Sequence, residues 1–124
     1  MAARLPHDLI TVMAGYARGG ILRPSTLRWI KELRLISQKL ILVFDQDQLL
    51  SVPKELTQDI NIVLICERHG AYDFGSYQRG LTVAERRGWL TNASHLLLCN
   101  DSVLGPFGDL YNFIETMILS LIHI

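Results

Sequence analysis

Apolar residues are concentrated in four short, nearly continuous runs, separated by longer segments of mixed character. Each run has the length of a strand, and most contain β-branched residues, which favour an extended backbone. Because the runs do not alternate between apolar and polar positions, we expect parallel strands that are covered on both faces. The predicted strands are residues 9–14, 40–44, 60–66 and 96–99.

The segment after the first run has the period of an amphipathic helix. It begins at Pro24, with Ser25 as the expected N-cap, and its apolar positions recur at i, i+4, i+7 and i+11. These positions are Trp29, Leu33, Ile36 and Leu40.

Three further connections have weaker or later helical patterns. Residues 49–56 contain Pro53 near their middle, which leaves room for only a turn or two of helix. Residues 76–87 place apolar side chains on one face, and Gly88 follows as a natural C-cap, although Gly80 lowers the helix propensity. A last helix is predicted from Pro106, with apolar residues spaced i, i+3, i+4 and i+7 up to residue 117.

Strands that alternate with helices predict an α/β fold of the Rossmann-like kind, with a parallel sheet of about four strands in the order 3-2-1-4. Ligands of such sheets bind beyond the carboxyl ends of the strands, so the residues after each apolar run should share one rim. A length of 124 residues allows one domain at most. We expect residues 1–124 to form a single partial domain, a Rossmann-like half-domain.

The composition and charge of the chain limit the kinds of partner and cellular location that we expect. Hydrophobic residues make up 49% of the chain and charged residues 19%, which is typical of a folded segment. Twelve basic and twelve acidic residues cancel, so no overall charge attracts nucleic acid. The sequence has neither a signal-peptide pattern nor an apolar run long enough to span a membrane. We therefore expect a cytoplasmic protein, with attachment to the inner face of the membrane left open.

Two other features concern the cysteines and the end of the chain. Cys66 and Cys99 each end an apolar run, which favours buried, reduced thiols over a metal site or a disulfide. Residues 117–124 form an apolar stub without a stop signal, so we expect a truncated chain. The final segment, 118–124, resembles translated adapter sequence and is not expected to be native.

Two carboxylates follow the second predicted strand. Asp45 and Asp47 are separated by one residue, a spacing that suits a divalent cation or a solvated turn equally well. The pair is also similar to the Asp-x-Asp of haloacid-dehalogenase-type phosphatases, in which one carboxylate is the nucleophile. Gln48 stands where that family has glycine, and a strand and helix precede the pair, so this phosphatase is the less favoured alternative.

The segment after the third predicted strand is the richest in candidate ligands. Asp73 or Ser76 can cap the following helix, and Gly75 permits an anion to approach the free N–H groups at its start. Arg68 and Arg79 bracket the segment, and a guanidinium can bind phosphate through two hydrogen bonds. Together these residues predict a diphosphate site. A lone histidine in a loop is more often solvated than catalytic, so we expect His69 to be a solvated loop residue.

Asn100 and Asp101 follow the fourth predicted strand. Magnesium is commonly held by one or two carboxylates together with substrate phosphates, so Asp101 could hold a metal with Asn100 as a neutral ligand. An Asx turn leading into Gly105 explains the same residues equally well.

Two strings, residues 72–81 (YDFGSYQRGL) and residues 96–106 (LLLCNDSVLGP), resemble the rhamnan synthesis protein F family. That family is associated with bacterial rhamnose-containing polysaccharides and O-antigens of lipopolysaccharide, and is similar to GT-A glycosyltransferases. The resemblance covers about residues 9–117 and implies a donor-binding half-domain. His69 and Ala71 stand where the family has asparagine and glycine.

The resemblance implies a function for several of these residues. A nucleoside diphosphate sugar would be the donor, and a glycan or lipid-linked molecule the acceptor. Asp101, helped by Asn100, would hold Mg²⁺ or Mn²⁺ on the diphosphate, in a position where many GT-A enzymes have Asp-x-Asp. Asp45 would contact the base. A catalytic base is expected from a later segment, so a non-catalytic nucleotide-binding fragment remains the main alternative.

Overall fold

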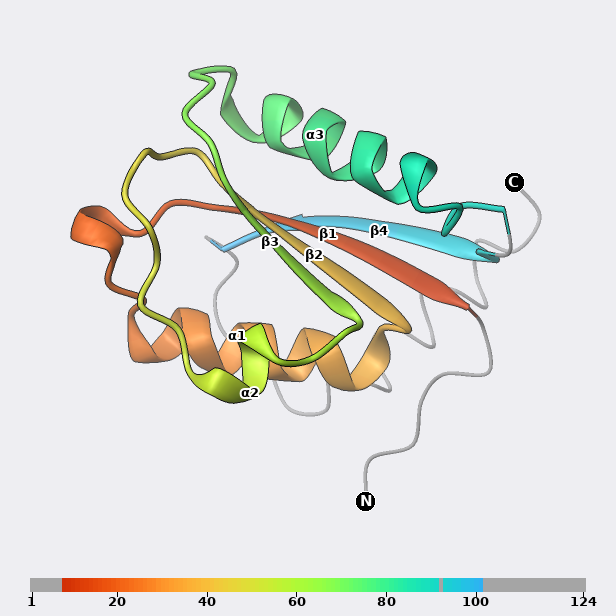
Figure 1. The fold of residues 1–124 in the computed structure, drawn as a ribbon, viewed down its shortest axis with the longest axis horizontal. Coiled ribbons are helices and arrows are strands. Elements are labelled where there is room, and N and C mark those ends of the chain that lie inside the picture. Colours follow the sequence, from red (N-terminus) through yellow and green to blue (C-terminus); the bar gives the residue numbers. More distant parts are fainter. Residues whose placement is uncertain (1–7, 92, 102–124) are drawn as a thin grey trace.

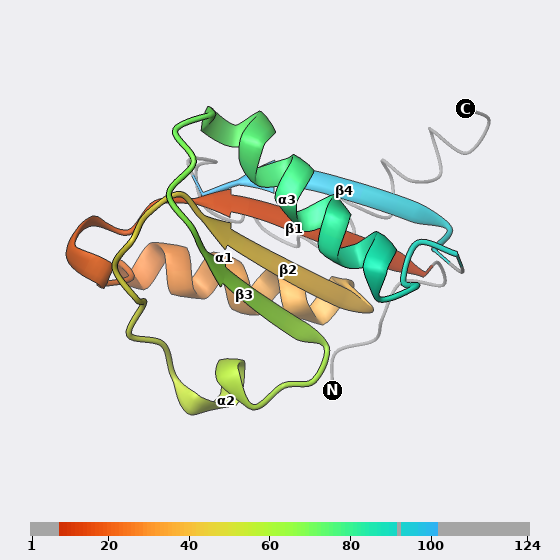
Figure 2. The same cartoon turned by 45° about the horizontal axis from the view of Figure 1, so that its top comes forward.

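The computed structural model describes residues 8–91 and 93–101. Within them, four parallel strands form one sheet in the order β3-β2-β1-β4, as the sequence predicts. All four strands run in the same direction, so their arrowheads lie at the same end of the sheet in Figure 2. The strands are β1 (Leu9–Gly15), β2 (Lys39–Phe44), β3 (Ile62–Cys66) and β4 (His95–Asn100).

The sheet lies between two layers of helix (Figure 1). Helix α3 (Tyr72–Arg86) covers one face, while α1 (Pro24–Ile36) and the single turn α2 (Lys54–Thr57) cover the other. A short 3-10 turn, η1 (Arg18–Gly20), connects β1 to the segment before α1. The α/β, Rossmann-like architecture predicted from the order of the elements is confirmed.

Alternation along β1 and β2 divides the core into two clusters. The residues under α1 include Leu9 and Met13 of β1, with Leu40, Leu42 and Phe44 of β2. The intervening residues of the two strands lie under α3 and pack with Ala84 of that helix. These strand residues are Ile10, Val12, Ile41 and Val43. Continuous apolar runs in β1 and β2 are therefore required, because both faces of these strands are buried.

The first helix differs from its prediction at both ends. Helix α1 starts at Pro24, with Arg23 rather than Ser25 as N-cap and no capping side chain. Proline suits this first position because an N–H there would have no acceptor within the helix, so its absence costs nothing. Leu40 does not extend the apolar stripe, since the helix ends at Ile36 and Leu40 belongs to β2.

The second long helix also starts earlier than predicted, at Tyr72 instead of residue 76. Ala71 is its N-cap, so the prediction that Asp73 or Ser76 caps the helix is wrong. Its other end is as predicted: Gly88 has φ +73° and donates to Glu85 O. Trp89 N–H donates to Ala84 O, which completes a Schellman motif.

Gly80 lies in the middle of α3 where the helix crosses the sheet. A Cβ at this position would lie 2.4 Å from Cγ1 of Val12, so only glycine lets the helix lie this close to β1. Close packing thus outweighs the low helix propensity of glycine.

Two predictions lie outside the described residues. They are the last helix, from Pro106 to residue 117, and the non-native segment 118–124.

The prediction that every strand is covered on both faces is wrong for β4. Leu96 and Leu98 of this strand are each more than two fifths exposed. In the described part of the chain, no helix has the length and apolar character that crossing a membrane would require.

Candidate functional site

Backbone hydrogen bonds continue past the carboxyl ends of the strands and bring the following residues to one rim. Asp45 N donates to Gly15 O at 3.1 Å, and Asp101 N donates to Ala14 O at 3.0 Å. Glu67 N extends the pairing of β3 with β2 in the same way. The rim predicted from the order of the strands therefore exists, and it contains the candidate acids Asp45 and Asp101.

Asp45 fastens the end of β2 to the loop after β3. Its Oδ1 accepts the N–H of His69 at 2.8 Å and the N–H of Gly70 at 3.2 Å. The hydrogen bond from the His69 amide, more than any other interaction, lowers the pKa of the Asp45 carboxyl below its ordinary value of 3.8. One oxygen of this carboxylate is therefore committed to shaping the loop.

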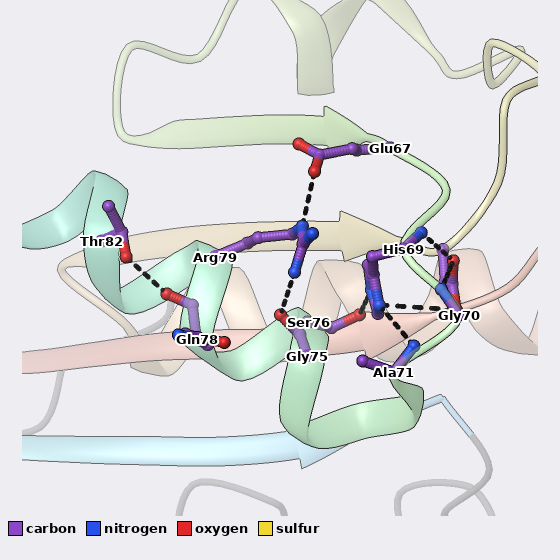
Figure 3. Close-up of polar contacts among 10 residues, drawn as sticks. Glu67, His69, Gly70, Ala71, Gly75, Ser76, Gln78, Arg79 and Thr82 are labelled. Carbon is purple, nitrogen blue, oxygen red and sulfur yellow. Dashed lines mark hydrogen bonds and ion pairs between the residues drawn. The ribbon is translucent and has the colours of Figure 1, made fainter.

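His69 lies inside the protein rather than in solvent. Its side chain is 1% exposed; Nδ1 lies 3.0 Å from the amide nitrogen of Ala71, and Nε2 lies 2.9 Å from Oγ of Ser76 (Figure 3). Because Nδ1 accepts from Ala71, the neutral ring carries its proton on Nε2 and donates it to Ser76. Oδ2 of Asp45 lies 3.7 Å from Nδ1. Both atoms are hydrogen-bond acceptors in this tautomer, so the two side chains do not form an ion pair.

Gly75 allows this arrangement because its own side chain is missing. A Cβ at Gly75 would lie 2.6 Å from Nδ1 of His69 and 2.5 Å from Cβ of Ala71. Both Gly75 and Ser76 are buried, whereas Asp73 in the same helical turn is exposed. The predicted anion contacts at Gly75 and Ser76 thus coincide with packing positions, which leaves Asp73 as the outward-facing candidate of this turn.

The two candidate arginines lie in different places. Nε of Arg79 donates to Oε1 of Glu67 at 2.6 Å, and Nη1 donates to Gly75 O at 3.3 Å (Figure 3). Arg68 instead approaches Asp47 at 4.0 Å, with both side chains about three quarters exposed. The structure therefore does not join Arg68 and Arg79 in one phosphate clamp.

The end of β4 connects two other parts of the rim. Nδ2 of Asn100 donates to Oδ2 of Asp73 in the first turn of α3, at 3.0 Å. Oδ2 of Asp101 accepts the N–H of Tyr16, in the loop after β1, also at 3.0 Å. Three segments distant in the sequence are thus fixed to one another at this corner.

A cavity of about 450 Å³ opens on the rim. It contains Asp45, Asp47 and Arg68, which the sequence singles out, and also Tyr16 and Gln46, which it does not.

Gln46 is 3% exposed and holds the floor of this cavity together. Its Oε1 accepts the N–H of Ala17 at 2.7 Å, and its Nε2 donates to Gln48 O. In the sequence, Gln46 is marked only by its position between two acids, and that position does not distinguish a buried glutamine from a solvated one.

A preformed metal cage is not seen in residues 8–91 and 93–101, which contain no group of three His, Cys, Asp or Glu side chains placed to hold an ion. Asp101 uses one carboxylate oxygen for Tyr16 and makes no hydrogen bond through Oδ1 within that part of the chain. Its chemistry fits a cation that takes one protein carboxylate and completes its shell with phosphate oxygens and water.

The rim therefore contains two ordered carboxylates, Asp73 and Asp101, together with a polar cavity that an exposed arginine, Arg68, lines. Comparison with known proteins adds no second line of inference to this geometry: the chain matches no family model, no curated protein and no solved structure.

Proposed function

We propose that the carboxyl edge of this sheet binds a nucleoside diphosphate sugar, as the donor half of a glycosyltransferase that acts on a glycan or lipid-linked acceptor. The observation that carries the proposal is the hydrogen bond between Asn100 and Asp73. It joins the two segments whose sequences resemble the rhamnan synthesis protein F family, and it does so at the edge where α/β sheets bind their ligands.

The cavity between the loops after β1 and β2 suits the nucleoside. Tyr16 is 58% exposed and offers an aromatic face on which a base can stack. Asp45 lines the cavity, fixes the loop after β3 through hydrogen bonds to its backbone, and retains Oδ2 as an acceptor for a base or ribose donor. Within residues 8–91 and 93–101, Arg68 is held only by an exposed ion pair, which is weak, so its side chain can turn to a phosphate.

Asp101 is the residue that would hold Mg²⁺ or Mn²⁺ on the diphosphate, next to Asn100. When bound, such a cation offsets the charge that develops on the departing nucleoside diphosphate. The chain's own contribution is to fix the Asp101 carboxylate through the Tyr16 amide, so that little reorganisation is needed when a ligand arrives.

Isothermal titration of the 124-residue chain with a dTDP-sugar, with and without Mn²⁺, tests this proposal. We expect Mn²⁺-dependent binding that Asp101→Ala abolishes and that Glu85→Gln, on the exposed surface of α3, leaves unchanged. Binding that is equally tight in Asp101→Ala would refute the role of this corner, and an absence of binding to the wild-type chain would refute the donor site.

Two alternatives give different results in turnover assays. Binding without any transfer or hydrolysis of the sugar nucleotide is expected of a non-catalytic nucleotide-binding module. Release of phosphate from p-nitrophenyl phosphate, lost in Asp45→Asn, is expected of a phosphatase. The two backbone hydrogen bonds to Oδ1 of Asp45 favour a structural role for this carboxylate over that of a nucleophile.

A further inference from the structure

A second cavity, of about 500 Å³, lies at the start of α1. Tyr16 borders both this cavity and the one on the rim, but the other lining residues come from residues 17–23, in and around η1, and from the first turn of α1. Its volume is within the usual range of small-molecule sites, roughly 300–1,000 Å³.

The N-terminus of α1 opens into this region without a cap. The helix is 13 residues long, and the side chain of its N-cap residue, Arg23, makes no capping hydrogen bond. Pro24 has no N–H, so Ser25 and Thr26 carry the first amides of the helix that lack an intrahelical acceptor. These amides and the helix dipole favour a negative charge.

Thr26 provides an independent indication of a ligand. The residue is 5% exposed and lines the cavity, yet its hydroxyl makes no hydrogen bond within residues 8–91 and 93–101. Side chains in the first turn of a helix lean toward its N-terminus, which directs this hydroxyl to the same place as the free amides. Because this hydroxyl oxygen is not one of the fully enclosed unpaired atoms of the described residues, it is open to the cavity that Thr26 lines, and its partner is expected there.

The charges around the cavity have one sign. Arg18 and Arg23 line it, and none of the lining residues within 8–91 and 93–101 carries a carboxylate. Neither guanidinium forms an ion pair in the described part of the chain, so both remain available to a ligand. The rim cavity, by contrast, contains Asp45 and Asp47 beside its single arginine.

We propose that the cavity at the N-terminus of α1 binds a phosphate group through the amides of Ser25 and Thr26, the Thr26 hydroxyl and the guanidinium of Arg18. Arginine binds phosphate bidentately, and the hydroxyl and amides add short, charge-assisted hydrogen bonds. This inference does not depend on the proposed donor site, because it uses neither Asp101 nor Asp73.

Titration of the ¹⁵N-labelled 124-residue chain with inorganic phosphate, at constant ionic strength, tests the proposal by NMR. We expect saturable shifts of the Ser25 and Thr26 amides in the millimolar range. Arg18→Gln should weaken this binding about tenfold, as the loss of one charge-assisted contact predicts, while Arg28→Gln, on the exposed side of the same helix, should not. Equal binding by both variants, or linear shifts without saturation, would overturn the site.

A pair of substitutions at Thr26 separates the hydroxyl from general effects of charge. Thr26→Val keeps the shape but removes the donor, and should weaken phosphate binding, whereas Thr26→Ser should restore it. The dispersion of the remaining amide signals shows whether each variant is folded. If Thr26→Val binds phosphate as tightly as the wild type, the hydroxyl has no part in the site and the proposal fails.

The phosphate could belong to a soluble molecule or to a lipid headgroup. Sedimentation with phosphatidic acid vesicles, compared with phosphatidylcholine vesicles, distinguishes the two sources. Co-sedimentation that Arg18→Gln reduces assigns the lipid, and saturable binding of inorganic phosphate without co-sedimentation assigns a soluble phosphate. Either result supports the site, whereas co-sedimentation unaffected by both Arg18→Gln and Thr26→Val contradicts it.

Discussion

Asn100, at the end of β4, donates a hydrogen bond from Nδ2 to Oδ2 of Asp73 in the first turn of α3, and this contact spans 27 positions of the sequence. Asp73 also stands at the positive end of the helix dipole, where a carboxylate is favourable. The start of α3 is therefore joined to the neighbouring strand end by a side-chain hydrogen bond that lies on the candidate rim.

Exchanging the two side chains tests this pair. Asn100→Asp replaces the donor with a second carboxylate about 3 Å from Asp73, and we expect the free energy of unfolding at pH 7 to fall by about 1 kcal/mol. Adding Asp73→Asn should recover most of the loss, because the amide then donates in the opposite direction. Urea unfolding of the single and double variants measures the recovery, and equal stability of the two would show that the pair does not interact.

The sequence predicts the sheet well because its main determinant is local. Strands that are buried on both faces need continuous apolar runs, and the runs around Val12 and Val43 show this directly. The order of the strands then follows from the connections, and the rim follows from the order. Less was predictable for β4, whose apolar run does not reveal that Leu96 and Leu98 lie exposed at the sheet edge.

The details of the site depended on contacts that no spacing reveals. Helix α3 begins at Tyr72, which has a φ of 57°, rather than at the first residue with helical apolar period. His69 is as typical of a solvated loop as of a core, and only the fold shows that Ser76 and Gly75 accommodate its ring. Arg79 is paired with Glu67, a residue that no pattern in the sequence marks as its partner.

Asp45 should make the stability of the protein depend on pH. Its pKa is lowered in the folded state, mainly by the hydrogen bond from the His69 amide, so the charged form favours folding. This contribution is complete above the ordinary value of 3.8 and is lost as the pH falls through the lower pKa of the folded protein.

Comparison with Asp45→Asn isolates that contribution, since asparagine can still accept both amide hydrogens but carries no charge. We expect the wild type to be the more stable at pH 7, and the difference to shrink as the pH falls below the ordinary pKa of 3.8. Urea unfolding at several pH values measures it. A difference that stays constant across this range would mean that the charge of Asp45 contributes nothing through these hydrogen bonds.

Gly80 should resist substitution by alanine although it lies inside a helix. At an exposed helical position this change stabilises by up to about 1 kcal/mol. Here the added Cβ would meet Cγ1 of Val12 at 2.4 Å, and Val12 is a fully buried residue of the central strand β1. We therefore expect Gly80→Ala to lower the free energy of unfolding by about 1–3 kcal/mol.

A double-mutant cycle identifies the cause of this loss. Val12→Ala alone opens a space in the core and destabilises the protein. In the Gly80→Ala background the same substitution also removes the overlapping methyl group, so its cost should be clearly smaller. Additive effects of the two substitutions would show that the overlap with Val12 does not explain the preference for glycine at residue 80.

Cys66 and Cys99 should remain reduced in the folded protein under oxidising conditions. They lie on β3 and β4, the two outer strands of the order β3-β2-β1-β4, and are separated by three strand spacings, or roughly 14 Å at ~4.8 Å each. A disulfide requires Cα atoms within about 7 Å. Burial, aided by the charge of Asp101, also raises the pKa of the Cys99 thiol to about 12, which leaves little thiolate to react at neutral pH.

Mass spectrometry after incubation with oxidised glutathione measures the outcome. We expect the intramolecular disulfide to be absent from the native chain and to form when the chain is unfolded in urea, where the two thiols can meet and the pKa of Cys99 returns to its ordinary range. Unfolded Cys66→Ser, which cannot form the bond, controls for other oxidation products. Ready formation of the disulfide under native conditions would contradict the parallel order of the strands, and with it the common rim on which the candidate site depends.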